Sequence, residues 1–111
     1  MMDDRLYLIH VTECTGRIER YTVPGQGAFL SDTMSQDAVL RNLHTLSEST
    51  QRLSDALEDQ HPEVDWTSIA AFRNVVVHNY LGIDLPRTWD IVGSDLPNPK
   101  RAISTMLEAH W

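Results

Sequence analysis

Cysteine is almost absent from this chain of 111 residues, which contains only Cys14. One cysteine cannot form an internal disulfide, and this usage fits a protein of the reducing cytosol. Cys14 lies on an apolar helical stripe, so we interpret it as a packing residue and not as a nucleophile. At this length folding removes roughly two thirds of the unfolded surface from water. Residues 1–111 are therefore expected to form a single domain that needs no disulfide or metal to fold.

Long apolar runs are missing as well. No stretch approaches the ~20 apolar residues that a membrane-spanning helix needs. The N-terminal residues MMDDRLYLIH lack the basic region and the long apolar core of a signal peptide. We therefore expect no membrane association and a cytoplasmic location.

Several motifs of common enzyme chemistries are also lacking. The sequence has no glycine-rich phosphate loop, no zinc-ligand pairing and no G-x-S-x-G nucleophile elbow. His10, His44, His61 and His110 are scattered and lack the paired spacing of metal ligands, so we interpret them as structural or solvated. The sequence accordingly predicts no metal site and no cofactor.

Basic residues are scarce, with nine lysines and arginines against sixteen acidic residues and a net charge of −7. A protein that gathers nucleic acid on a broad surface needs the opposite sign, because binding depends on neutralising many phosphates. The acidity is equally typical of a solvated helical surface. If this protein acts on RNA, the sequence predicts a local basic cleft, in which Arg41 or Arg87 could assist Arg73.

Helical periodicity dominates the chain, and no stretch alternates convincingly at period two. The sequence thus predicts an all-α fold, an up-and-down bundle of four or five helices. Breaks are expected at prolines and glycines, with Pro97-Asn98-Pro99 either kinking the fourth helix or separating a fifth that Asn98 caps. The predicted helices cover residues 3–21, 33–60, 66–81 and 85–96, with the fifth reaching toward 111.

Two of these helices carry specific expectations. The first has one apolar stripe through Cys14 and Ile18 and a shorter edge at Leu8 and Val11. Two such faces indicate either one broad core face or a core face plus a subunit interface. The second helix is expected to begin at a Thr33–Gln36 capping box or at Ser35, and to pack nearly antiparallel to a neighbour. Its apolar seam contains Val39, Leu43, Leu46, Leu53 and Leu57, with Thr50 in the one weak position.

The stretch WTSIAAFRNVVVHNYLGID at residues 66–84 carries the candidate chemistry. It combines an arginine, an amide, a histidine and a phenol on one predicted helix: Arg73, Asn74, His78 and Tyr80. Arg73 and His78 are five residues apart, or roughly 140° around an ideal helix, so they can flank one ligand without contacting each other. A guanidinium fork beside a titratable imidazole suits a phosphodiester, since the fork holds phosphoryl oxygens while the ring transfers protons.

These residues resemble a known family. The pattern Arg73, four residues, His78, one residue, Tyr80 is similar to the R-x4-H-x-Y signature of HepT toxins, a branch of the HEPN ribonuclease superfamily. Asn74 matches the polar residue that HEPN proteins usually carry after the arginine. The likeness covers nearly the whole chain and includes Asp37-Ala38-Val39, Arg41-Asn42, Trp66 and Trp89-Asp90-Ile91-Val92.

The resemblance implies a HEPN bundle that acts as a homodimeric, metal-independent endoribonuclease on transfer RNA or messenger RNA. It implies that Arg73 and His78 are catalytic, that Asn74 supports them, and that the product ends in a 2′,3′-cyclic phosphate. It also implies a toxin–antitoxin pair, in which an MntA-type minimal nucleotidyltransferase inactivates the toxin by AMPylation of Tyr80. The alternative is a catalytically silent HEPN module that binds a nucleotide or a partner protein.

Overall fold

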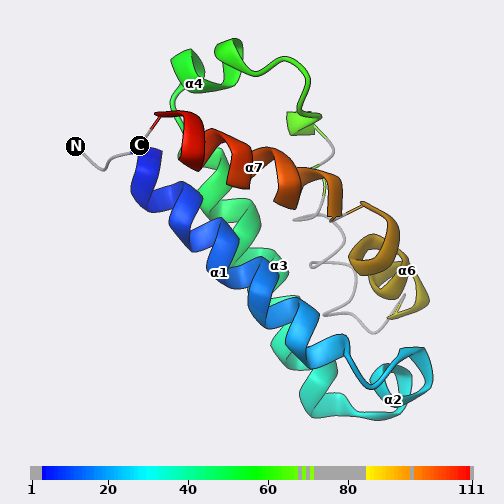
Figure 1. Ribbon diagram of the computed structural model, residues 1–111. Helices are drawn as coiled ribbons and strands as arrows, with labels where there is room; N and C mark the ends of the chain where they lie inside the picture. The colour runs from blue at the N-terminus through cyan, green and yellow to red at the C-terminus, as the bar shows by residue number, and fades with distance from the viewer. Residues whose placement is uncertain (1–3, 68, 70, 72–84, 96, 111) are drawn as a thin grey trace.

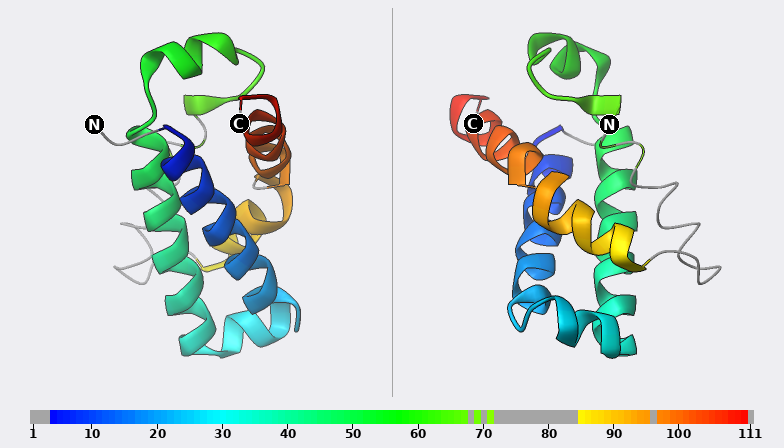
Figure 2. Two further views of the ribbon diagram at one scale, coloured as in Figure 1. Left: turned by 60° about the vertical axis from the view of Figure 1, so that its left-hand side comes forward. Right: turned by 90° about the vertical axis from the view of Figure 1, so that its right-hand side faces the viewer.

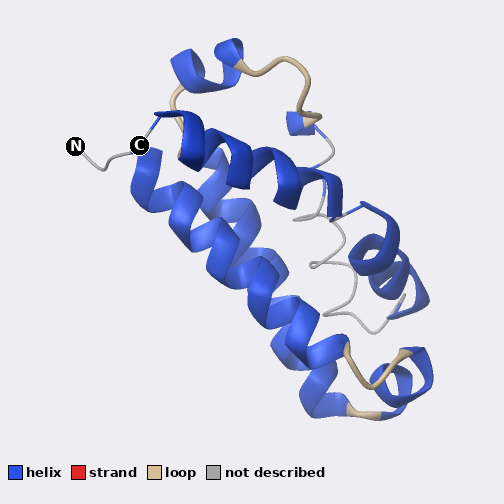
Figure 3. Cartoon of the chain, in the orientation of Figure 1, coloured by secondary structure: helices blue, strands red, loops and turns tan. Residues whose placement is uncertain are grey.

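The computed structural model describes residues 4–67, 69, 71, 85–95 and 97–110. Within these residues the chain is entirely helical apart from its loops, and no strand is found among them (Figure 3). The predicted all-α class is therefore confirmed. The described elements are α1 (Asp4–Thr22), α2 (Gln26–Ser31), α3 (Thr33–Gln51), α4 (Asp55–Gln60), α6 (Leu85–Asp90), the π-helix η1 (Ile91–Asp95) and α7 (Pro97–His110).

The two longest helices, α1 and α3, lie side by side and antiparallel (Figure 1). Helix α7 packs along α1, whereas α2 contacts α3 and α6. Helices α2 and α4 lie at opposite ends of the α1–α3 pair, which gives principal extents of 41 × 25 × 24 Å (Figure 2). The α1–α3 pair is consequently the frame to which the other described helices attach.

The core lies where α1, α3 and α7 meet. The seam predicted on the second helix is buried throughout, and the hydroxyl of Thr50 in its weak position donates to the Leu46 carbonyl at 2.8 Å. This local bond satisfies the one polar side chain of the seam. The most buried apolar side chains are Leu8, Val11 and Ile18 of α1, Val39, Leu43 and Leu46 of α3, Ile103 and Met106 of α7, and Phe29, Ile69 and Ile91.

The second apolar edge of α1 belongs to this core. Leu8 is 0 % exposed and Val11 is 2 % exposed within the single chain, whereas Tyr21 at the end of the predicted main stripe is 36 % exposed. The hypothesis that Leu8 and Val11 contribute to a subunit interface is therefore wrong. Leu8 and Val11 share one buried face with Cys14 and Ile18, because α3 and α7 pack against α1.

The prediction of one continuous helix over residues 33–60 is also wrong. Helix α3 ends at Gln51, and α4 begins at Asp55. The Ser54 hydroxyl caps α4, since it accepts a hydrogen bond from the Leu57 amide at 3.2 Å. Ser54 is a favourable N-cap residue, and Leu53 and Leu57 stay buried on either side of the break. The apolar seam is therefore continuous across the break, although the helix is interrupted there.

The helices differ from prediction at four further places. Asp32, and not Thr33 or Ser35, caps α3, since its carboxylate accepts from the Met34 amide at 3.1 Å. The short helix α2 follows the glycine-containing break, and η1 follows α6; neither was predicted. Helix α7 begins at Pro97, so Asn98 lies inside it and is not its cap. A proline is tolerated there because first-turn amides have no intrahelical partner.

One hydrogen-bonded contact ties the start of α1 to the α3–α4 break. The Asp4 carboxylate accepts from the Ser54 amide at 2.9 Å and from its hydroxyl at 2.6 Å, across 50 residues of sequence. Bonds to a charged group contribute about 1.5–3 kcal/mol, and less where they are exposed, as these are. We expect Asp4→Ala to lower the free energy of unfolding by ~1 kcal/mol in urea denaturation. An unchanged midpoint would show that this contact does not stabilise the break.

Candidate functional site

The residues of the R-x4-H-x-Y block, Arg73, Asn74, His78 and Tyr80, lie outside the described residues. The segment that leads into them is described, and it supports the predicted start of the helix. Residues 66, 67, 69 and 71 are helical, and the Ile69 amide donates to the Asp65 carbonyl at 3.3 Å. The Trp66 indole donates to the His61 carbonyl at 3.1 Å, which anchors this start against the end of α4.

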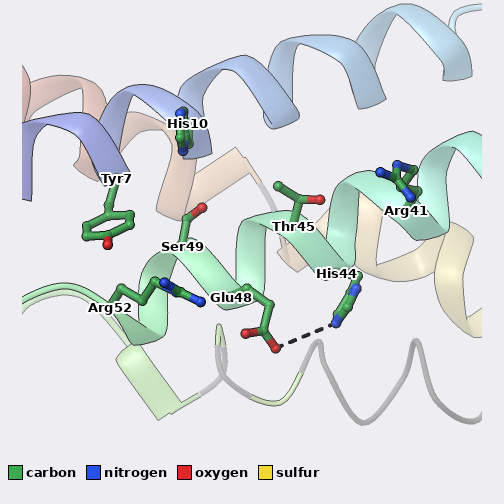
Figure 4. A pocket seen from close by; sticks show the side chains of 8 residues that line it. All are labelled: Tyr7, His10, Arg41, His44, Thr45, Glu48, Ser49 and Arg52. Carbon is green, nitrogen blue, oxygen red and sulfur yellow. Dashed lines mark ion pairs between the residues drawn. The ribbon is translucent and has the colours of Figure 1, made fainter. Parts of the chain in front are cut away.

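A polar groove of about 470 Å³ runs between α1 and α3 (Figure 4). We name it the α1–α3 groove. Tyr7 and His10 reach into it from α1, and the remaining residues come from α3 and its C-cap. Every described side chain of the lining carries a hydrogen-bonding group: Tyr7, His10, Arg41, His44, Thr45, Glu48, Ser49 and Arg52.

The wall from α3 is one helical face. Arg41, His44, Thr45 and Glu48 recur at steps of three, one and three, and Arg52 lies four residues beyond Glu48. Positions three and four apart lie on the same side of a helix, and eleven residues span about 16 Å. This face is opposite in character to the leucine seam of the same helix. The groove is therefore a polar strip that extends along α3.

Positive groups outnumber negative ones in the groove. Arg41 and Arg52 are exposed, and within the described part of the chain neither forms an ion pair, unlike Arg17 with Glu13 and Lys100 with Glu19. Among the lining residues that the structure describes, Glu48 is the one acid, and His44 Nε2 lies 3.5 Å from its carboxylate. A protein of net charge −7 thus has a local site with two available guanidinium groups.

Sequence reasoning identified only part of this groove. Arg41 was a candidate for a basic cleft and does line the groove, whereas Arg87 is exposed on α6 and does not. His10 and His44, which were expected to be structural or solvated, lie in this lining, and the His44 side chain is 48 % exposed as expected for a solvated group. Arg52 was missed. The available signal was the recurrence of polar residues at helical spacing on the face opposite to the leucines.

His61 and Cys14 follow the predictions more closely. His61 forms a 2.8 Å contact with Glu63, and this hydrogen bond lowers the pKa of the Glu63 carboxyl. Cys14 is buried, and burial raises the pKa of its thiol, as is typical of a packing residue. No group of three metal-binding side chains is found among the residues that the structure describes. None of the described helices is both long and apolar enough to cross a membrane.

Comparison with known proteins connects this fold to RNA cleavage. The family model described as "Ribonuclease HepT-like" matches residues 11–106. A Thermococcus cleftensis protein named "Probable ribonuclease HepT" is 32 % identical over 95 residues, which cover 85 % of this chain and 86 % of that protein. A Caldanaerobacter subterraneus protein named as a "Putative RNase" is 27 % identical over 109 residues, or 97 % of each chain.

A third relative is longer. The Methanocaldococcus jannaschii protein named "Gamma-glutamylcyclotransferase and putative RNase" is 30 % identical over 107 residues, which cover 96 % of this chain. The chain spans about half of that protein, 48 % of its length. No solved structure matches the chain.

The fold and the groove define a small all-α protein with a cation-lined polar strip. The match over residues 11–106 makes the assignment specific, because it covers most of the chain. This chain belongs to the HepT-like ribonuclease family, whose fold is the HEPN bundle.

Proposed function

We propose that this chain is a metal-independent endoribonuclease and the toxin of a toxin–antitoxin pair, with transfer RNA or messenger RNA as its substrate. The observation that carries the proposal is the match of the HepT-like ribonuclease model to residues 11–106, which include the complete R-x4-H-x-Y block. The ribonuclease names of the relatives support the same activity class.

The proposed reaction is an internal transesterification. One His78 removes the proton of a ribose 2′-hydroxyl, and the 2′ oxygen attacks the adjacent phosphorus. The bond from phosphorus to the 5′ oxygen breaks, and this oxygen takes a proton from a second His78. The products are a 2′,3′-cyclic phosphate and a 5′-hydroxyl. Arg73 holds the phosphoryl oxygens with its planar fork, and Asn74 orients the arginine or the phosphate.

This reaction requires two proton-transfer groups, whereas each chain offers one His78. We therefore propose a two-fold homodimer in which the motif helices face one cleft, since two copies then supply the general base and the general acid. Leu8 and Val11 are excluded from its interface by their burial. Light scattering at micromolar concentration is expected to give twice the mass of 12.7 kDa, and a monomer alone would contradict the dimer.

The test of the activity is incubation of the purified protein with total RNA, with Arg73→Ala as the matched inactive control. We expect the parent to produce fragments with cyclic phosphate ends and the variant to produce few. Equal cleavage by both proteins would indicate a contaminating nuclease. No cleavage by either protein would favour the silent HEPN module that binds a nucleotide or a partner protein.

The partner that we propose for this toxin is an MntA-type nucleotidyltransferase, which transfers AMP from ATP to Tyr80. The position of Tyr80, two residues beyond His78 in the sequence, supports this choice. An adenylyl group there adds a negative phosphodiester near the proposed arginine fork, where it would compete with the RNA phosphate.

A further inference from the structure

The α1–α3 groove has no role in the reaction proposed above, which uses only residues of the R-x4-H-x-Y block. Its two guanidinium groups are nevertheless placed where they can bind anions. Arg41 and Arg52 lie at the two ends of the polar strip on α3, and both belong to the lining of one continuous groove. Their separation along the helix is about 16 Å, which is too long for a single phosphate to bridge.

The lining between the two arginines is suited to a hydrated polar chain. Thr45 and Ser49 offer hydroxyl groups, and His10 and His44 offer imidazole rings on which a base could stack. Among the described residues no aliphatic side chain lines the groove, so its apolar surface comes from the carbon atoms of polar side chains and is interrupted by hydrogen-bonding groups. His44 Nε2 lies 3.5 Å from the Glu48 carboxylate, so the acid has a partner within the groove. These properties together favour an extended polyanion.

From these observations we propose that the α1–α3 groove binds single-stranded RNA, with Arg41 and Arg52 contacting phosphates other than the one that is attacked. This inference rests on the proposed ribonuclease function and adds a substrate-binding subsite to it. The groove would resolve the conflict between an acidic protein and an anionic substrate, because affinity then depends on a local strip and not on the net charge.

The test measures binding separately from cleavage. The probe is a fluorescein-labelled 2′-O-methyl RNA of about 12 nucleotides, a length within the usual range of single-strand sites. It lacks a free 2′-hydroxyl and therefore cannot be cut. Fluorescence anisotropy at several salt concentrations compares the parent with Arg41→Gln and Arg52→Gln. Arg101→Gln is the matched control, since Arg101 is exposed on α7, carries the same charge and lies outside the groove.

Each groove variant should lose one phosphate contact, which makes the negative slope of log K against log salt less steep by about 0.7 for a single strand. At 0.1 M salt, relative to 1 M, this change corresponds to roughly fivefold weaker binding of the probe. Arg101→Gln should keep both the slope and the affinity of the parent. Unchanged binding by the groove variants would overturn the proposal. An equal loss in Arg101→Gln would do so as well, since it would show that only total charge matters.

Two further outcomes separate this proposal from the others. If the groove variants bind the probe normally but lose affinity for the nucleotidyltransferase, the groove is a protein-docking surface and the inference is refuted. If the parent binds the probe through the groove but never cuts natural RNA, the ribonuclease proposal fails while the RNA-binding assignment stands. Circular dichroism of both variants should match the parent, because Arg41 and Arg52 are exposed.

Discussion

His78→Ala should lower the rate of RNA cleavage by about 10²- to 10⁴-fold, which is the usual cost of losing a proton-transfer group. In the proposed dimer one substitution removes the general base and the general acid together, so the upper part of that range is expected. The measurement is the single-turnover cleavage rate of a labelled RNA at saturating protein. The thermal transition of the variant should stay close to that of the parent, because the role assigned to His78 is chemical.

Arg73→Lys is the companion substitution. It keeps the positive charge but removes the planar fork, so a loss of cleavage here would show that bidentate geometry and not charge alone is needed. Arg101→Gln serves again as the control and should cleave at the parental rate. Parental rates in His78→Ala or Arg73→Lys would show that the motif is structural. Loss of cleavage with a chelator would indicate a metal mechanism instead.

Tyr80→Phe should separate nuclease activity from its inactivation by the nucleotidyltransferase. The variant is expected to keep nuclease activity, because phenylalanine preserves the ring, and to escape the nucleotidyltransferase completely, because the phenol oxygen that accepts the AMP is gone. Intact mass after incubation with the partner, ATP and Mg²⁺ measures this directly. The parent should gain about 329 Da per transferred AMP, the mass of the moiety attached through its phosphate.

Tyr21→Phe is a matched control, since Tyr21 is an exposed phenol at the end of α1. This variant should gain the same mass as the parent. A mass gain that persists in Tyr80→Phe, or no gain in the parent, would refute Tyr80 as the acceptor. Tyr80→Phe that is harmless in every assay, including neutralisation by the partner, would instead support a purely structural tyrosine that closes an apolar helix face.

The α1–α3 groove shows how an acidic protein can present local positive charge to RNA. The net charge of −7 by itself disfavours binding of an anionic nucleic acid. The structure places Arg41 and Arg52 in one groove, and Glu48 is the only acid among its described lining residues, so the composition gives a misleading picture of the local electrostatics. Charges farther apart than the Debye length of about 8–10 Å are largely screened at physiological salt, which makes the local arrangement decisive.

Local sequence patterns specify the helical class and much of the core. The spacing of Val39, Leu43 and Leu46 predicts their buried seam, and the predicted end of the second helix at residue 60 coincides with the end of α4, because the residue before a proline is disfavoured in a helix. These features are local, since they depend on residues within one or two turns. The R-x4-H-x-Y block is also a local pattern, and the family match over residues 11–106 is consistent with it.

The end of α3 and the set of residues that share the groove depend on packing between distant segments. The seam continues at helical spacing past Gln51, so its periodicity predicts a single helix. The helix breaks instead where the Asp4 carboxylate, 50 residues away in sequence, accepts a hydrogen bond from the Ser54 amide. Likewise Tyr7 and His10 join the polar face of α3 only because α1 packs antiparallel to it. Periodicity encodes which face of a helix is apolar, whereas the partner of each face is set by packing between segments distant in sequence.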